Sequence, residues 1–249
     1  MLRQIWSRRR EAGITMVEVM VATTLAVLLG GMVTTLVIGT QQQTAITQTR
    51  LADVDSSRVG MDALTRVLRT AVQPAQLQTG CTSCIGPAST STALTAAEPN
   101  RLQLFANLGD PTGPFLITFT AALNATGVPT LTERIQRPDL GSAPNFTYTS
   151  CTPGASGCRI TTRVLVYGLK WPLTTGLFTY RDNAANVLAV QTGQTGLTTS
   201  QLLLVDSIDI TLPVQTPKGG EAAFSAATRV ALPNAATAVL ATAVPMPGG

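Results

Sequence analysis

The stretch Gly13-Ile14-Thr15-Met16-Val17-Glu18-Val19-Met20 joins a basic leader to a long apolar segment, and the organisation of the whole chain starts from it. Glu18 is the one charged residue in this stretch, and no Asp, Glu, Lys or Arg follows until Arg50. A carboxylate at the edge of an apolar segment is costly unless a partner neutralises it. Glu18 is therefore predicted to have a functional partner.

The apolar segment that follows is long enough to cross a membrane. Val19 to Ile38 is mostly apolar, and about twenty helical residues at ~1.5 Å each match a hydrocarbon core of ~30 Å. A cleaved secretory signal peptide is the alternative, but its apolar region usually has only about 7–15 residues, and no clear Ala-x-Ala site follows here. A plain membrane anchor would leave Glu18 and the abrupt boundary at Gly13 unexplained.

The residues from Gly13 to Glu18 resemble the cleavage and methylation motif of type IV prepilins and type II secretion pseudopilins. This resemblance implies that a prepilin peptidase in the membrane cuts between Gly13 and Ile14 and methylates Ile14, the new N-terminus. It also implies that Glu18, the fifth mature residue, is the carboxylate used in filament assembly. Ile14 departs from the Phe that is commoner at this position.

The chain is expected to have three parts. Residues 1–13 form a cleaved leader, residues 14–72 form the N-terminal helix with its membrane or filament-core segment at 14–39, and residues 73–249 form an extracytoplasmic β-rich domain. The leader's arginines would keep the N-terminus on the cytoplasmic side during insertion. Loss of the leader removes four arginines and one glutamate, which lowers the formal net charge from +4 to +1. A nearly neutral mature chain gives no electrostatic reason to expect nucleic-acid binding.

The helix is expected to continue past the membrane segment, because no Pro occurs between Ile14 and Val72. Apolar residues at spacings of three and four predict one stripe that docks on the chain's own β domain. The stripe consists of Leu51, Val54, Met61, Leu64 and Leu68, with Arg58 in the remaining register position.

The rest of the chain alternates short apolar runs with polar and small residues, which is typical of antiparallel strands. The predicted strands are Arg101–Ala106, Phe115–Thr120, Ile160–Leu169, Leu177–Tyr180, Val187–Val190, Leu202–Leu212 and Thr228–Leu232. Residues 181–186 read as a hairpin turn, and Thr82 to Pro99 as a long surface loop. The expected fold class is α+β and pilin-like: a long N-terminal helix packed on a C-terminal antiparallel sheet domain. The order of elements most resembles the J-type minor pseudopilins and the W-type minor pilins.

Four cysteines fall into two local pairs, Cys81 with Cys84 and Cys151 with Cys158. A Cys₄ zinc site is conceivable, but the second pair is spaced too widely for a usual zinc knuckle. A redox pair of the thioredoxin kind needs its first Cys at a helix N-terminus, whereas Cys81 lies in an expected loop. Disulfides within each pair fit best, because the helix orientation exports the domain to an oxidising compartment.

Catalytic chemistry is not expected. The chain has no histidine, which removes the usual general base and the commonest metal ligand. Asp182 with Asn183 and Asn186 could supply calcium ligands, but a solvated turn is the better interpretation. Asp206 and Asp209 are three residues apart in an expected strand, so they would point to opposite faces. No enzyme activity, metal or cofactor is predicted.

The sequence therefore predicts a minor pilin or pseudopilin subunit, built into a type IV pilus or a type II secretion pseudopilus. Its expected partners are prepilin peptidase, other pilins or pseudopilins bound through the N-terminal helix, and an inner-membrane assembly platform. It would cross the cell membrane once, with its C-terminal domain outside the cytoplasm, before it enters the filament. The alternative is a membrane-anchored extracytoplasmic binding or adhesion protein that does not polymerise.

Overall fold

The computed structural model describes residues 15–73, 92–142, 146–173, 175–215 and 224–233. The chain divides into two compact units, residues 1–49 and residues 50–249. Four residues singled out in the sequence lie outside the described ones: Gly13, Ile14, Cys81 and Cys84.

A single helix, α1 (Met16–Arg69, 54 residues), occupies the N-terminal part of the chain. Its length agrees with the absence of Pro from this stretch, and its last turn carries Arg66 and Arg69, which interact favourably with the helix dipole. The helix ends three residues before the predicted boundary at Val72, and Val72 instead donates its N–H to the carbonyl of Phe105 at 3.0 Å.

The second unit contains two antiparallel sheets. The five-stranded sheet is a meander in chain order: β1 (Leu94–Ala97), β2 (Arg101–Ala106), β3 (Phe115–Leu123), β4 (Pro129–Gln136) and β5 (Ile160–Tyr167). The three-stranded sheet runs in the order β6 (Phe178–Arg181), β7 (Ser207–Val214) and β8 (Phe224–Ala231). A short helix, α2 (Thr199–Leu202), precedes β7. The fold is α+β and pilin-like, as predicted.

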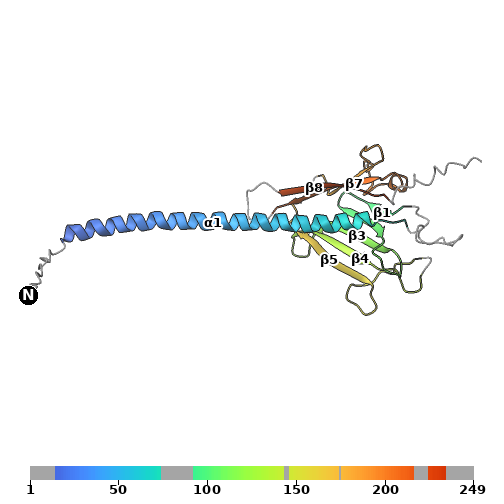
Figure 1. Ribbon diagram of the computed structural model, residues 1–249, viewed down its shortest axis with the longest axis horizontal. Helices are drawn as coiled ribbons and strands as arrows, with labels where there is room; N and C mark the ends of the chain where they lie inside the picture. Colours follow the sequence, from blue (N-terminus) through green and yellow to red (C-terminus); the bar gives the residue numbers. More distant parts are fainter. Residues whose placement is uncertain (1–14, 74–91, 143–145, 174, 216–223, 234–249) are drawn as a thin grey trace, which may run out of the picture. The chain divides into compact units, whose positions relative to one another are not determined.

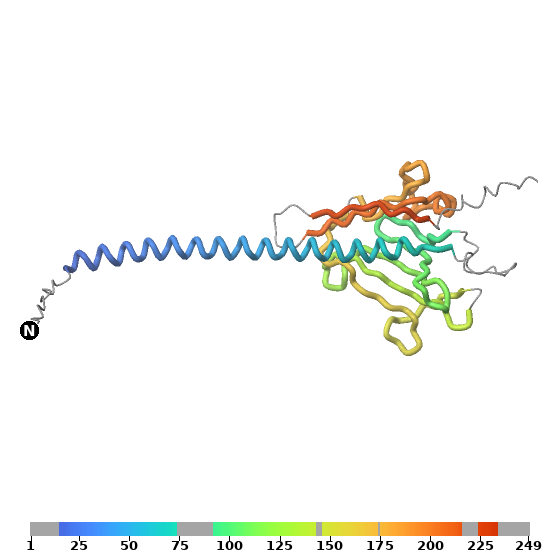
Figure 2. Tube along the Cα trace, in the orientation of Figure 1, coloured from blue at the N-terminus to red at the C-terminus, as the bar shows by residue number. Residues whose placement is uncertain are grey.

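The C-terminal part of α1 lies lengthwise between the two sheets (Figures 1 and 2). A Cβ atom added at Gly60 would lie 2.2 Å from Cγ2 of Val166 in β5 and 3.7 Å from Cδ1 of Leu212 in β7. Only a residue without a side chain permits this approach. The two sheets are also joined directly, since Leu169 and Val214 form an isolated antiparallel bridge.

The buried stripe of α1 confirms the predicted one at Leu64 and Leu68, and the predicted Met61 is partly buried against the core. It consists of Ser57, Gly60, Leu64, Val67 and Leu68. Leu51 was predicted to belong to it but is 61% exposed, and Arg58 is also exposed. The stripe is shifted toward Ser57 and Gly60, which are both buried, and Gly60 lies against Val166 in β5. A pattern of large apolar residues does not reveal such small buried residues.

Most predicted strands are confirmed, although their ends move by a few residues. Two strands were missed. β1 falls inside the predicted surface loop and has only four residues. β4 begins at Pro129 and contains Glu133 and Arg134, so its sequence lacks an apolar run; Pro is acceptable at the first position of a strand.

Two stretches predicted as strand are not strand. Residues 187–190 form only one isolated bridge, between Arg181 and Val187. Residues 199–202 are helical because Thr198 and Gln201 form a reciprocal capping box at the start of α2. The strand that was predicted from Leu202 therefore begins only at Ser207.

Candidate functional site

The N-terminal part of α1 is the first candidate site, because it is apolar and buries nothing against the described part of the chain. Every residue from Thr15 to Gln48 is exposed. The segment's most apolar window has a mean hydropathy of 2.1 and no buried residue. By length and composition this is the one helix in the described part of the chain that could span a membrane. A helix that is apolar on all faces needs a surrounding of lipid or of other helices.

Threonine hydroxyls in this half of α1 are already satisfied within the helix. Each donates to a backbone carbonyl three or four residues earlier, at 2.7–3.0 Å, and the group includes Thr23, Thr24, Thr34, Thr35 and Thr40. Such bonds let a hydroxyl enter an apolar environment without losing a partner. The threonines therefore do not exclude the segment from a bilayer or from a tightly packed helix bundle.

Glu18 lies in the first turn of α1, where the helix dipole favours an acidic side chain. Its backbone N–H donates to Oγ1 of Thr15 at 3.3 Å and to the carbonyl oxygen of Thr15 at 3.0 Å. Thr15-Met16-Val17-Glu18 therefore has the spacing of a capping box, with Glu at the third helical position. This local role of Glu18 was not predicted, although the Thr-x-x-Glu pattern is visible in the sequence.

The Glu18 carboxylate has no ion-pair or hydrogen-bond partner among residues 15–73 or the other described ranges. Val19, Ala22, Thr23 and Ala26 line the exposed helix surface beside it. The carboxylate is thus available to a group from outside this helix. Gly30 and Gly31 do not interrupt the helix, and nothing lies within 4 Å of either Cβ position.

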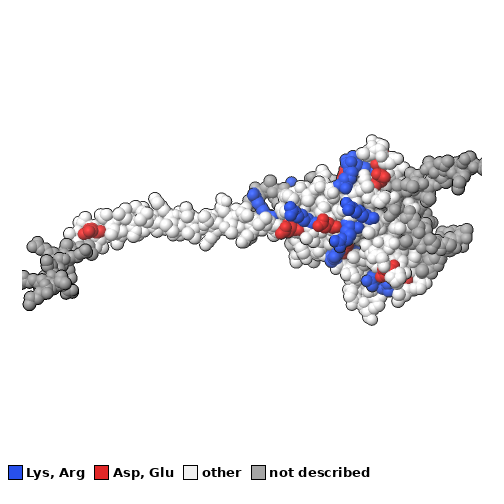
Figure 3. All heavy atoms as spheres, in the orientation of Figure 1, with Lys and Arg blue, Asp and Glu red and all other residues white. Residues whose placement is uncertain are grey.

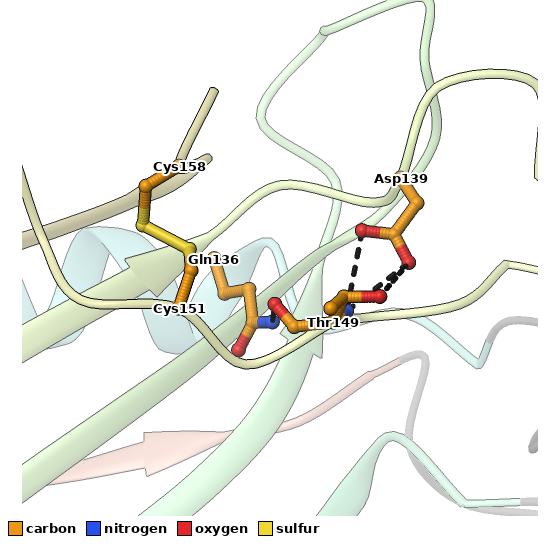
Figure 4. Close-up of a disulfide and its surroundings, with 5 residues drawn as sticks. All are labelled: Gln136, Asp139, Thr149, Cys151 and Cys158. Atoms are coloured by element: carbon orange, nitrogen blue, oxygen red, sulfur yellow. Dashed lines mark hydrogen bonds between the residues drawn. A yellow bond between two sulfur atoms is a disulfide. The ribbon is translucent and has the colours of Figure 1, made fainter. Parts of the chain in front are cut away.

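The second candidate site is the loop closed by Cys151 and Cys158. Their sulfur atoms are 2.04 Å apart and their Cα atoms 5.6 Å apart, so this predicted disulfide is confirmed (Figure 4). Residues 152–157 between them are all exposed. A closed surface loop of this kind is typical of proteins in oxidising compartments.

The segment before the disulfide is held in place by side-chain hydrogen bonds (Figure 4). Nε2 of Gln136 donates to the carbonyl oxygen of Thr149 at 2.9 Å. The Asp139 carboxylate accepts from Oγ1 of Thr147 and from the N–H and Oγ1 of Thr149, at 2.8–3.2 Å. The bond from Thr147 is the main reason that the pKa of Asp139 lies below its usual value. These contacts fix the loop's base, but they do not form a catalytic or metal-binding arrangement.

The remaining candidate residues have structural roles. The Asp182 carboxylate accepts from the N–H groups of Ala184 and Asn186 and from Nδ2 of Asn186, so the predicted turn is confirmed. The described residues contain no group of three or more potential metal ligands. Asp206 lies before β7, and Asp209 within it pairs with Arg181 and Arg229.

Comparison with protein-family models, with curated proteins and with solved structures finds no match.

Proposed function

We propose that this chain is a minor pilin or pseudopilin subunit, processed by prepilin peptidase and assembled into a type IV pilus or a type II secretion pseudopilus. The observation that carries the proposal is the N-terminal half of α1. It is exposed on every face, strongly apolar, and carries a single carboxylate, Glu18, without a partner among the described residues. Such a helix suits a subunit that passes from a lipid bilayer into a bundle of like helices.

The carboxylate gives assembly an electrostatic driving force. Cleavage after Gly13 would make Ile14 a charged N-terminal amine only four residues from Glu18. In a poorly hydrated filament core with an effective dielectric constant near 20, a carboxylate and an amine at ~4 Å attract by about 4 kcal/mol before desolvation is counted. The exposure of Glu18 supports this pairing, because the amine of a neighbouring subunit can reach its carboxylate.

The extracytoplasmic location of the second unit is supported by the Cys151–Cys158 disulfide. In the proposed topology the chain crosses the cell membrane once and its β-rich unit folds outside the cytoplasm, before the subunit moves into the filament. Its partners are then prepilin peptidase, other pilins or pseudopilins, and an inner-membrane assembly platform. We propose a structural role without catalysis, because the chain lacks histidine.

The intact mass of the protein purified from its native envelope tests this proposal against a plain membrane anchor. We expect the mass of residues 14–249 plus one methyl group, with the methyl on Ile14. A Gly13→Val variant should keep its leader, since the peptidase must close around a residue that has no side chain. A native protein that retains residues 1–13 would contradict the proposal and favour an anchored binding or adhesion protein.

A further inference from the structure

Five charged residues form one stripe on the outward face of α1 where the helix packs on the β-rich unit. They are Asp55, Arg58, Asp62, Arg66 and Arg69, at spacings of three and four residues. At about 100° per residue, these positions fall within an arc of roughly 80°, opposite the stripe that is buried against the sheets. Figure 3 shows acidic and basic side chains following one another along this face. We call these five residues the charge stripe.

The charge stripe is available for a contact between molecules. Arg58, Asp62 and Arg66 form no ion pair with any residue that the structure describes. Two large apolar side chains share the same face, since Leu51 is 61% and Val59 is 64% exposed. Exposed apolar side chains between alternating charges are typical of a helix surface that pairs with another helix.

We infer that the charge stripe binds the same stripe of a second copy of this chain, parallel to it and offset along the helix axis by one helical turn. This inference rests on the proposed function, because insertion into one membrane in one orientation makes neighbouring helices parallel. If two parallel copies met without an offset, Asp55 would face Asp55, Arg58 would face Arg58 and Asp62 would face Asp62. Like charges held opposite each other repel, so that arrangement is disfavoured.

An offset of one turn, ~5.4 Å, converts these repulsions into attractions. Asp55 then faces Arg58 of the neighbouring copy, Arg58 faces its Asp62, and Asp62 faces its Arg66. An offset of two turns again brings Asp55 opposite Asp62 and Arg58 opposite Arg66. Arg69 does not change this order: one turn adds a single repulsion, Arg66 against Arg69, to the three attractions, and two turns add a single attraction, Asp62 to Arg69, to the two repulsions. The signs therefore favour the one-turn offset among these registers.

An offset contact has a consequence for the assembly. Each copy has a single charge stripe on one face of α1, and the partner covers most of it, so the contact joins two copies. On this basis the charge stripe sets the axial offset between two neighbouring subunits, while other surfaces, including the apolar N-terminal half, contact further subunits.

Charge reversal in the full-length chain tests the inference, with recovery in the sheared filament fraction as the measurement. Asp62→Arg removes the attraction to both Arg58 and Arg66 of neighbouring copies and replaces it with repulsion, so we expect recovery to fall on the order of tenfold. The matched control is Lys170→Glu, which reverses an exposed charge away from the stripe and should leave recovery unchanged. The loss should also shrink at high salt, because exposed charges are screened.

An inverted stripe separates self-recognition from other partners. The combined change Asp55→Arg, Arg58→Asp, Asp62→Arg, Arg66→Asp and Arg69→Asp reverses every sign of the stripe and keeps each facing pair as it was, so it should restore recovery to near the wild-type level. If the stripe instead binds a different protein or an anionic lipid surface, this variant should be the worst of all, and our inference falls. The inference also falls if Asp62→Arg alone assembles like wild type.

The offset itself can be measured by cross-linking. We expect disulfide cross-links when Asp55→Cys and Val59→Cys chains are expressed together, because these positions differ by one turn. In-register contact would instead give cross-links within each single variant, and that result would overturn the inference. If wild-type chain is absent from the sheared fraction, both the proposed function and this inference fail. If wild-type chain is present but the stripe variants or the cross-links give the contradicting results stated above, the inference alone fails.

Discussion

Residues 16–48 expose every side chain, whereas residues 57–68 of the same helix bury Ser57, Gly60, Leu64, Val67 and Leu68. Both stretches have the same backbone hydrogen bonding and lie in α1. They differ in what covers their apolar side chains. The chain's own sheets cover those of the second stretch, and nothing in the described part of the chain covers those of the first. On the proposed function, hydrophobic residues of this one helix therefore serve folding in one half and association in the other.

The comparison predicts that leucines in the two regions contribute very differently to stability. Leu64 is fully buried, so Leu64→Ala should lower the free energy of unfolding of the β-rich unit by about 2–5 kcal/mol. The exposed Leu51 is the matched control, and Leu51→Ala should change it by less than about 0.5 kcal/mol. Urea unfolding of the detergent-solubilised chain, followed by Trp171 fluorescence, measures both. Equal losses in the free energy of unfolding for Leu64→Ala and Leu51→Ala would contradict the distinction between buried and exposed leucines of α1.

Two glycines in α1, Gly60 and Gly31, test the same difference between the two regions, with smaller expected effects. Gly60→Ala places a methyl group against Val166, so it should destabilise the β-rich unit by about 1–3 kcal/mol. Gly31→Ala meets open space and removes a poor helix former, so it should favour the helix by ~1 kcal/mol. In thermal unfolding, the midpoint temperature should fall for Gly60→Ala. For Gly31→Ala it should rise or stay the same. A destabilising Gly31→Ala would show that this half packs on something within its own chain.

Acid should affect the two regions unequally, and this is the smallest expected effect. Hydrogen bonding to Arg229 and then to Arg181 lowers the pKa of Asp209 below its ordinary value of 3.8. Because the folded pKa lies below the unfolded one, the stabilisation is present above pH 3.8 and is lost as the pH falls through the folded pKa. The loss should be under about 1 kcal/mol.

The control for the acid experiment is Asp209→Asn, which should be less stable than wild type near neutral pH and lose less stability on acidification. Urea unfolding at several pH values measures the difference. Residues 19–49 contain no ionisable side chain, so the helicity of this stretch, measured by circular dichroism in detergent, should stay constant over the same range. An Asp209→Asn variant with the full wild-type acid sensitivity would remove Asp209 from the explanation.

The sequence allowed the helix, the α+β class and the Cys151–Cys158 disulfide to be predicted, because each depends on local spacing. Leu64 and Leu68 of the buried stripe were predicted from their spacing, but Ser57 and Gly60 could not be, since the shape of the sheets and not hydrophobicity selects small residues there. Likewise β4 escaped detection because Glu133, which is fully buried, accepts a hydrogen bond from Nε of Arg163 on the neighbouring strand. Such a pairing depends on contacts between strands, which a single sequence does not display.

The candidate site could also be predicted only in part from the sequence. Glu18 stood out in the sequence because it is alone in a long apolar stretch, and the structure adds its place beside the Thr15 cap in the first turn of α1. In the sequence, the residues of the charge stripe appear only as charged positions between the apolar positions of the helix. Its role could be inferred only once the structure showed which face of α1 the sheets cover. The buried residues of α1 identify that face.

The most direct test of the central claim is the recovery of Glu18 variants in sheared filaments relative to membranes. Glu18→Ala should insert and be cleaved normally, because loss of a charge eases insertion. It should fail to enter filaments, because the neighbour's buried amine loses its partner at a cost of several kcal/mol, and Glu18→Gln should fail nearly as badly. Equal recovery of Glu18→Ala and wild type in the filament fraction would contradict the claim that this half of α1 is built for assembly through its carboxylate.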